Sequence, residues 1–174
     1  ISGGSILGTS VGRLMVGGGG QAGSEGLLTI QGSAASIAVS VFSVGCSDSV
    51  GTNAGTGTVA FEVVNGAVTA VNAGNVYIDP IAAAASITTL MASGTGTAPT
   101  SDIVLVNNTG ANAVLGVFDN AAEGTIFNIA GVDMTLTYKY IAGTDQIAND
   151  IALVIPEPAT LALLGLGLLS FRRK

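Results

Sequence analysis

The sequence lacks several residue types on which many enzyme sites depend. Histidine and tryptophan are absent from the 174 residues, and cysteine occurs once, at Cys46. Without histidine and with a single cysteine, zinc sites, Ser-His-Asp or Cys-His catalysis and histidine acid–base chemistry are excluded. A lone cysteine also forms no internal disulfide, so we expect Cys46 to be a small buried apolar residue rather than a reactive thiol.

Positive charge is scarce before the last twenty residues. Arg13 and Lys139 are the only cations there and stand against ten acidic residues, so this part carries a net charge of −8. Because nucleic-acid binding depends on clustered lysine and arginine, the composition argues against a nucleic-acid partner. Aromatic platforms for sugars are also missing, since Tyr77, Tyr138 and Tyr140 are scattered along the chain.

The last twenty residues form a segment of a different kind. A Pro-Glu-Pro triplet opens it, an uncharged leucine-rich run follows over 159–171, and three consecutive cations end it. The prolines keep the backbone extended and cannot continue a strand, whereas the leucine-rich run favours a helix. At about 1.5 Å per residue this run spans roughly 20 Å of a ~30 Å hydrocarbon core, which predicts a transient membrane anchor.

This arrangement resembles the PEP-CTERM sorting signal of Gram-negative bacteria. The resemblance implies export across the inner membrane, followed by recognition and removal of the tail by an exosortase, a membrane-embedded cysteine transpeptidase-like enzyme. It divides the chain into a β-rich extracellular domain over 1–154, called the body below, and a sorting and transmembrane tail over 155–174. Residues 159–171 would enter the inner membrane transiently. The matching residues are Pro156, Glu157, Pro158, Arg172, Arg173 and Lys174.

An exported protein needs an amino-terminal signal peptide. The sequence begins at Ile1, and no cationic stretch followed by an apolar core opens it. We therefore expect a mature or truncated form from which the signal peptide is missing.

The body reads as short β-strands separated by glycine and small polar residues. Alternation of apolar and polar residues over 37–41 and 134–140 predicts strands with one face toward a core. Stretches rich in β-branched and aromatic residues, which favour strands, are Leu27 to Ile30, Ile37 to Val44, Thr58 to Val64, Asn75 to Ile78, Ile103 to Val106, Ala113 to Phe118 and Val132 to Tyr140.

Two stretches of the body look like one repeated unit of strand, polar loop, strand and x-Gly turn. The first extends from Leu14 to Ala34 and the second from Phe42 to Ala67, and a fainter third copy begins at Leu90 and reaches Ala111. A spacing of roughly 28 to 34 residues is typical of stacked coils. The pattern is similar to passenger-type, autotransporter-associated β-helix repeats, which implies an all-β fold built as a short right-handed β-solenoid. An antiparallel β-sandwich explains the same strands and stays the alternative.

One helix and one hairpin complete the predicted body. Asp79 as N-cap, Pro80 at the first helical position, an alanine run and a closing Gly94 predict a helix over about 80–92 that packs on the sheet. Residues 123–138 resemble the hairpin that closes β-helix proteins of this kind, and we expect a C-terminal hairpin before the apolar sorting helix.

An acidic turn after that hairpin is a candidate metal site. Asp145, Asn149 and Asp150 supply carboxylate and amide oxygens, which are the ligands of a weak Ca²⁺ site. The same residues also suit an Asx-rich turn that satisfies its own backbone, and we favour this second interpretation. No cofactor is expected.

These features predict a secreted or cell-surface structural protein of an extracellular matrix or biofilm. Its expected partners are the exosortase, and extracellular polysaccharide or further copies of the chain assembled as filaments. A carbohydrate-binding or adhesin module is the alternative. A polysaccharide-active enzyme is disfavoured, because the carboxylates that catalysis would need lie at loops or strand edges. They are Glu25, Glu62, Asp79, Asp102 and Glu123.

Overall fold

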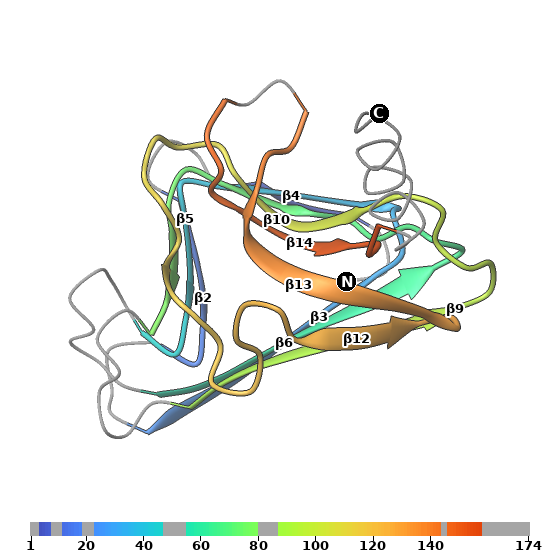
Figure 1. The fold of residues 1–174 in the computed structure, drawn as a ribbon. Coiled ribbons are helices and arrows are strands. Elements are labelled where there is room, and N and C mark those ends of the chain that lie inside the picture. Colours follow the sequence, from blue (N-terminus) through green and yellow to red (C-terminus); the bar gives the residue numbers. More distant parts are fainter. Residues whose placement is uncertain are drawn as a thin grey trace, which may run out of the picture.

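The computed structural model describes residues 4–7, 12–18, 23–46, 55–79, 87–143 and 146–157. Within these residues the chain is all-β, with fourteen strands in three sheets. In Figure 1 the three sheets lie along the sides of a triangle that surrounds the core. The side chains of the first strand are not described.

The strands of the three sheets have the following bounds. The seven-stranded sheet contains, in spatial order, β1 Gly4–Leu7, β4 Ala35–Val39, β7 Val71–Ala73, β10 Ile103–Asn108, β14 Asp150–Val154, β13 Val132–Tyr140 and β12 Ile126–Ile129. The four-stranded sheet contains β11 Leu115–Gly116, β8 Val76–Ile78, β5 Val41–Val44 and β2 Arg13–Val16. The three-stranded sheet contains β3 Ser24–Gln31, β6 Gly55–Val64 and β9 Ile87–Thr95.

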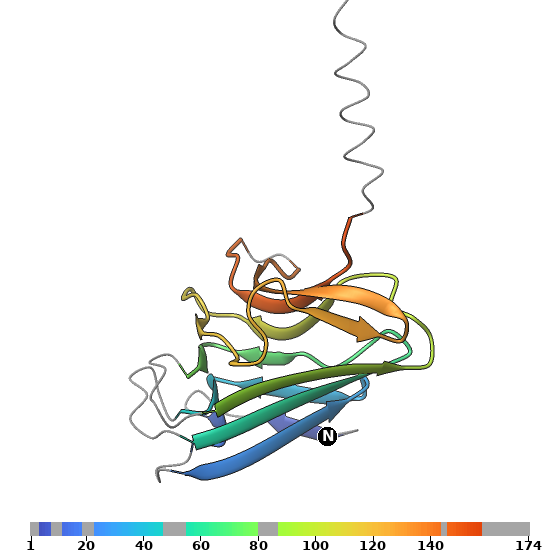
Figure 2. The ribbon, with the colours of Figure 1, turned by 60° about the horizontal axis from the view of Figure 1, so that its bottom comes forward.

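Parallel pairs join strands that are three elements apart in the sequence. β1, β4, β7 and β10 form one such ladder, β2, β5, β8 and β11 a second, and β3, β6 and β9 a third. Gly26 pairs with Gly57 and Thr56 pairs with Ile87, a spacing of 31 residues in each case. Figure 2 shows these strands stacked one above another.

Each ladder contributes columns of apolar side chains to the core. In the three-stranded sheet, for example, Val59 lies between Leu28 and Leu90. Every second residue of β6 is buried, including Phe61 at 1% exposure. Burial of such side chains stabilises the fold by roughly 1.5–3 kcal/mol each, so in-register stacking is the main source of cohesion. The same stacking forms the columns Leu14–Phe42–Val76, Val16–Val44–Ile78, Ile37–Val71–Val106 and Ile30–Phe61–Ala92.

The corners between sheets repeat as the strands do. The residues that follow β2, β5 and β8 are Gly17, Gly45 and Asp79, and all three have a positive φ, of 74°, 72° and 41°. Glycine adopts this conformation without the steric cost that a side chain brings, so Asp79 is the unusual member. Hydroxyl groups at corners also donate to the backbone of the preceding turn, as Ser40 does to Gly12 at 2.6 Å.

The carboxy-terminal end of the stack is closed by antiparallel strands. β14 pairs with β10 on one side and with β13 on the other, and β12 and β13 form a hairpin. The hairpin turn consists of Ala130 and Gly131, which both have a positive φ, as a two-residue type I′ connection requires. The predicted C-terminal hairpin is therefore confirmed.

The edge of β9 at this end is closed by side chains rather than by a strand. Asp119 Oδ2 accepts hydrogen bonds from Thr88 N at 2.6 Å and from the Thr88 hydroxyl at 3.0 Å. Asn120 accepts from Leu90 N at 2.8 Å and donates to Leu90 O at 2.9 Å. Together with the Asp119 N–H, which donates to Thr88 O at 3.1 Å, the two side chains supply the hydrogen-bond partners that an edge strand lacks.

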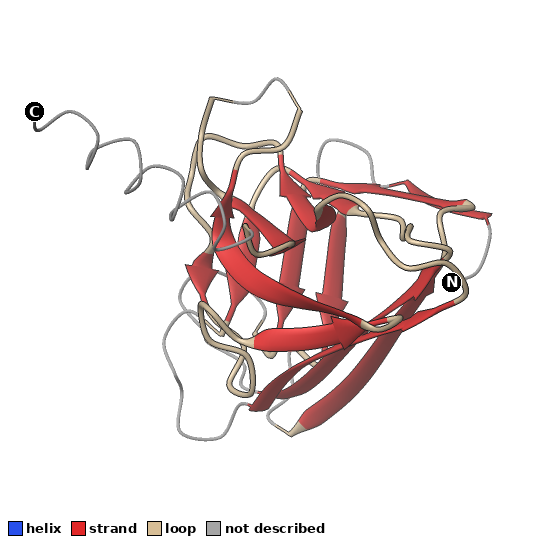
Figure 3. Cartoon of the chain, turned by 45° about the vertical axis from the view of Figure 1, so that its right-hand side comes forward, coloured by secondary structure: helices blue, strands red, loops and turns tan. Residues whose placement is uncertain are grey.

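The predicted helix over about 80–92 is wrong for its described part. Residues 87–95 form β9, which pairs with β6 in register, and Figure 3 shows strands and loops but no helix among the described residues. The β-branched residues from Ile87 to Thr89 favour a strand, and an existing partner strand outweighs the preceding alanines. Residues 80–86 lie outside the described residues.

The repeat prediction is right for two copies and misplaced for the third. Leu14 pairs with Phe42 and Gly26 with Gly57, as the aligned units predict. The third set of strands in these two ladders is β8 and β9, whereas β10, which had been assigned to the third copy, pairs with β7 and β14. Cys46 is buried as predicted.

Candidate functional site

The junction between the body and the tail lies at the closed end of the stack. β14 ends at Val154, Ile155 is half-buried, and Pro156 and Glu157 are exposed. Ile155 N donates a hydrogen bond to Asp102 Oδ1 at 2.9 Å. Pro156 has no backbone N–H, so it cannot donate a further hydrogen bond to a neighbouring strand.

Tyr140 on β13 interacts with the same carboxylate. Burial, the charge of Asp102 and a side-chain hydrogen bond with Asp102 raise the pKa of Tyr140, and the charge of Asp150 adds to this effect. The phenol is therefore protonated at neutral pH. The Asp102 carboxylate thus bonds to the first residue of the tail and lies close enough to Tyr140 of β13 to influence its pKa.

A buried polar network lies beside this junction, where the calcium site was predicted. Asp150 is fully buried, and its two carboxylate oxygens accept from Asn108 N and Ala142 N, each at 2.7 Å. Asn149 donates to Gly110 O at 2.8 Å. These contacts tie the start of β14 to the loop after β10.

Both interpretations of the acidic turn, the weak calcium site and the favoured Asx-rich turn, stay predictions. Asp145 lies outside the described residues, and among the described ones no group of three or more histidine, cysteine, aspartate or glutamate side chains could hold a metal. Asn149 and Asp150 lie next to each other and use most of their polar atoms on backbone groups. Asn149 is fully buried, and its Oδ1 has no hydrogen-bond partner in the described structure.

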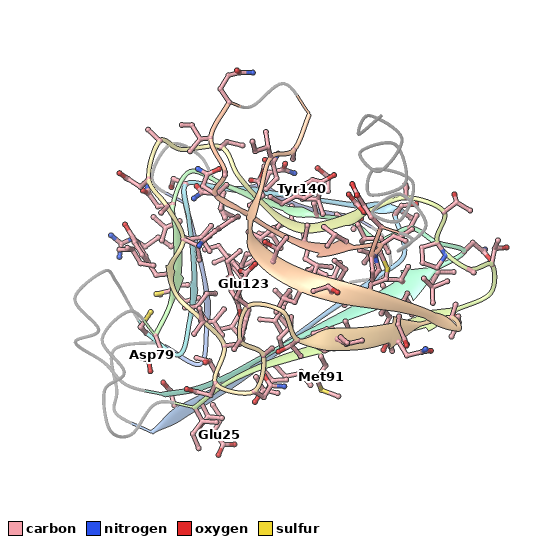
Figure 4. All side chains as sticks on the ribbon, viewed as in Figure 1. Glu25, Asp79, Met91, Glu123 and Tyr140 are labelled. Atoms are coloured by element: carbon pink, nitrogen blue, oxygen red, sulfur yellow. The ribbon has the colours of Figure 1, made fainter. Side chains whose placement is uncertain are left out.

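The carboxylates that polysaccharide hydrolysis would need come from separate elements. Glu25 lies on the outer face of β3, Asp79 at a buried corner after β8, and Glu123 in the loop before β12, where it accepts from Tyr138 N at 2.8 Å. Figure 4 shows Glu25 and Asp79 toward the lower left of the view and Glu123 nearer the middle. Retaining or inverting hydrolysis requires two carboxyl groups about 5–10 Å apart across a cleft.

Tyr138 has a structural role. Its hydroxyl donates to Ala121 O at 2.6 Å and accepts from Phe118 N at 3.1 Å. Burial raises the pKa of Tyr138 to about 12, with the hydrogen bond from Phe118 opposing this shift and the charge of Glu123 adding to it. Tyr138 lines a pocket of about 430 Å³ together with Glu123, Lys139 and small apolar residues, but it is only 8% exposed, so it offers no open aromatic face.

Tyr77 points to the outer face of the four-stranded sheet instead. Its neighbours Val76 and Ile78 are buried in the core, while Tyr77 is half-exposed. The register places Met15, Ser43, Tyr77 and Leu115 in one row across this sheet. Met15 and Leu115 are 43% and 41% exposed, whereas Ser43 is fully buried, so the exposed part of the row consists of two apolar side chains and one aromatic ring.

Sequence reasoning assigned Asp102 to a possible catalytic pair and missed its contact with the tail. The contact joins residues 53 positions apart, and no local motif marks it. Asp119 and Asn120 were missed for the same reason, since their partners in β9 lie about 30 residues away. A side chain that bonds to a distant backbone leaves no periodic trace in the sequence.

Comparison with known proteins bears on the tail alone. A family model described as the PEP-CTERM protein-sorting motif matches residues 154–174. Neither curated proteins nor solved structures match the chain. Residues 158–174 of the motif lie outside the described residues, and in the described part no helix is long and apolar enough to cross a membrane. The motif indicates an exported, cell-surface-directed protein that an exosortase sorts.

Proposed function

We propose that the chain is a structural protein of the bacterial cell surface or extracellular matrix, delivered through its sorting tail. In this proposal the body is a short β-solenoid. The observation that carries it is the regular parallel pairing of strands three elements apart, in a body whose last strand leads into the sorting motif. Hydrogen-bonded ladders and stacked apolar columns suit a rigid support rather than a moving catalyst.

The outer faces of the sheets support a role at a hydrated surface. Along β6, the outward residues Thr56, Thr58 and Ala60 alternate with buried ones. In the seven-stranded sheet, Asn107 of β10 donates to Asn72 of β7 at 2.9 Å. Hydroxyl and amide groups of this kind bind water and polysaccharide without strong charge. Extracellular polysaccharide is therefore the proposed environment of the body.

Self-association is part of the same proposal. β1, β2 and β3 are edge strands of their sheets, and edge strands pair readily with other chains. The opposite end is closed by β12, β13 and β14. Bodies can therefore add to the stack at one end only. We therefore propose association of two bodies through these edges in preference to filaments, because a filament needs two different open surfaces.

Delivery is tested in a Gram-negative host that contains an exosortase. We expect the wild-type chain at the cell surface without its tail. The variant Pro156→Ala, Glu157→Ala, Pro158→Ala should remain in the inner membrane with the tail attached. Equal surface delivery and equal processing of the two chains would refute the proposed sorting.

A carbohydrate-binding module is the second candidate, and the Tyr77 row is the observation that favours it. Such a module would be retained on host exopolysaccharide in a saturable manner, and Tyr77→Ala would abolish retention. The matched control is Tyr140→Phe, which leaves the four-stranded sheet untouched. Retention that is independent of Tyr77, or absent, favours the structural role. Release of reducing ends from the polysaccharide would instead indicate an enzyme.

A further inference from the structure

The last described hydrogen bond between the body and the sorting motif goes to a side chain. β14 is antiparallel to β10 with Leu153 opposite Ile103, so Asp102 stands beside the end of β14. The N–H of Ile155 points to Asp102 Oδ1 at 2.9 Å instead of to a backbone carbonyl. A charged acceptor makes a stronger hydrogen bond than a neutral one. The ladder of β14 therefore ends on the Asp102 carboxylate.

This contact separates a held segment from an exposed one. Val154 and Ile155 are half-buried, and Ile155 packs against the core cluster. Pro156 and Glu157 are exposed, and Pro156 cannot donate a backbone hydrogen bond. If the hydrogen bond to Asp102 broke, Ile155 and then Val154 would be free to leave the body. These two residues immediately precede the Pro-Glu-Pro triplet.

Tyr140 lies near the same carboxylate. It comes from β13, the neighbour of β14 on the side opposite β10, and Asp102 contributes to the rise of its pKa. Asp102 is itself exposed, and the donor that holds it in the described structure is Ile155 N.

We propose that Asp102 is a latch that limits how much of the chain before Pro156 a processing enzyme can engage. The inference rests on the proposed sorting by an exosortase. An enzyme that cuts a chain binds several residues in an extended form on both sides of the bond. With the latch closed, the accessible chain starts at Pro156. With the latch open, Ile155 and then Val154 can leave the body and enter the enzyme.

Hydrogen exchange tests the latch directly in the full-length chain. We compare wild type with Asp102→Ala, Asp102→Asn and Tyr140→Phe by following the Ile155 amide in detergent micelles. Asp102→Ala should accelerate exchange of this amide about tenfold or more, since a hydrogen bond to a charged group is lost. Asp102→Asn keeps an acceptor oxygen and should give a smaller increase. Glu25→Gln, an exposed carboxylate on β3, is the matched control and should change nothing.

Processing in exosortase-containing cells tests the consequence. The fraction of chain without its tail should rise in the order wild type, Asp102→Asn, Asp102→Ala, with Glu25→Gln equal to wild type. Unchanged exchange at Ile155 overturns the latch. Faster exchange with an unchanged or lower processed fraction overturns its control of access. A wild-type chain that is never processed refutes the proposed sorting instead, so the two failures are distinguishable. Both measurements are repeated on Tyr140→Phe, which loses the phenol hydroxyl and retains the Asp102 carboxylate.

Discussion

The two ends of the stacked strands differ in how their edges are treated. At the carboxy-terminal end, β14 covers β10, and Asp119 and Asn120 bond to the backbone of β9. At the amino-terminal end, β1, β2 and β3 are the outermost strands of their sheets. Figure 2 shows the antiparallel strands at one end and the amino terminus at the other.

This difference in edge treatment indicates the end at which the stack can be extended. Parallel strands stacked in register offer the same pairing pattern at each step, so only a change of strand direction or a side-chain cap stops the series. Both devices occur at the carboxy-terminal end. The sorting motif leaves from that same end, at Ile155, and so stays away from the edge strands through which we propose that two bodies associate.

The largest effect is expected when the closed end is opened. Asp119→Ala combined with Asn120→Ala removes four hydrogen bonds to β9. At about 1 kcal/mol each, the free energy of unfolding should fall by about 3–4 kcal/mol, as measured by urea unfolding. The exposed edge should also promote association, which sedimentation velocity would detect.

The control for this variant lies at the other end. Leu27 on β3 is 70% exposed, so Leu27→Thr should change the unfolding free energy by less than about 0.5 kcal/mol. If the double variant at the closed end is no more destabilised than Leu27→Thr, the cap does not stabilise β9 and the contrast between the ends is wrong.

Tyr138→Phe probes the closed end with a smaller change. The substitution leaves Ala121 O and Phe118 N without their buried partner, and we expect a loss of about 2 kcal/mol. The pKa of Tyr138 is raised in the folded state from 10.0 to about 12, so the unfolded chain releases its proton first. Stability should therefore fall as the pH rises from about 10 through 12.

This decline should be shallower in Tyr138→Phe. Chemical unfolding at pH 9, 10 and 11 measures the slope for both chains. A slope that does not depend on Tyr138 would indicate that its hydroxyl is not held in the folded state, and the hydrogen bonds to Ala121 and Phe118 would lose their structural importance.

Asp79→Gly tests the corner series that lies between the two ends. Asp79 has a φ of 41°, it is 8% exposed, and its Oδ1 has no hydrogen-bond partner in the described structure. Glycine occupies the same corner at positions 17 and 45 and relieves the strained backbone. We expect the melting temperature to rise, with a gain of about 1 kcal/mol. A loss of stability would indicate that residues outside the described part bind this carboxylate.

The smallest effect is expected at the turn of the closing hairpin. Ala130 has a φ of 49°, which costs an alanine more than a glycine or asparagine. Ala130→Asn should therefore stabilise the chain by about 0.5 kcal/mol, measured by urea unfolding against Ala122→Asn in an exposed position. Equal changes in the two variants would indicate that the turn is not strained.

The sequence predicts the paired register well where the corner residues repeat. Leu14 and Phe42 precede identical Val-Gly corners two residues further on in their strands, and the alignment of these corners gives the observed pairing. The third copy was lost because Asp79 takes the place of the glycine at that corner. An alanine run then suggested a helix where β6 provides a partner for Ile87 and the residues after it.

The contacts that define the two ends were not predictable in this way. Asp119 and Asp102 each accept hydrogen bonds from backbone groups far along the chain, and nothing in their neighbours distinguishes them from solvated carboxylates. Tyr138, in contrast, lies in a stretch whose alternation predicts a strand with one face toward the core, and the structure places Tyr138 on that buried face. Periodicity predicts which way a side chain faces but not which distant backbone group it bonds.

The position of Ile155 has a consequence for what remains once the tail is gone. β14, the last of the described strands, ends at Val154, and Pro156 and Glu157 belong to none of the three sheets. A cut beyond Ile155 would therefore remove the sorting signal and leave every described strand in place, including the closing strands β12, β13 and β14.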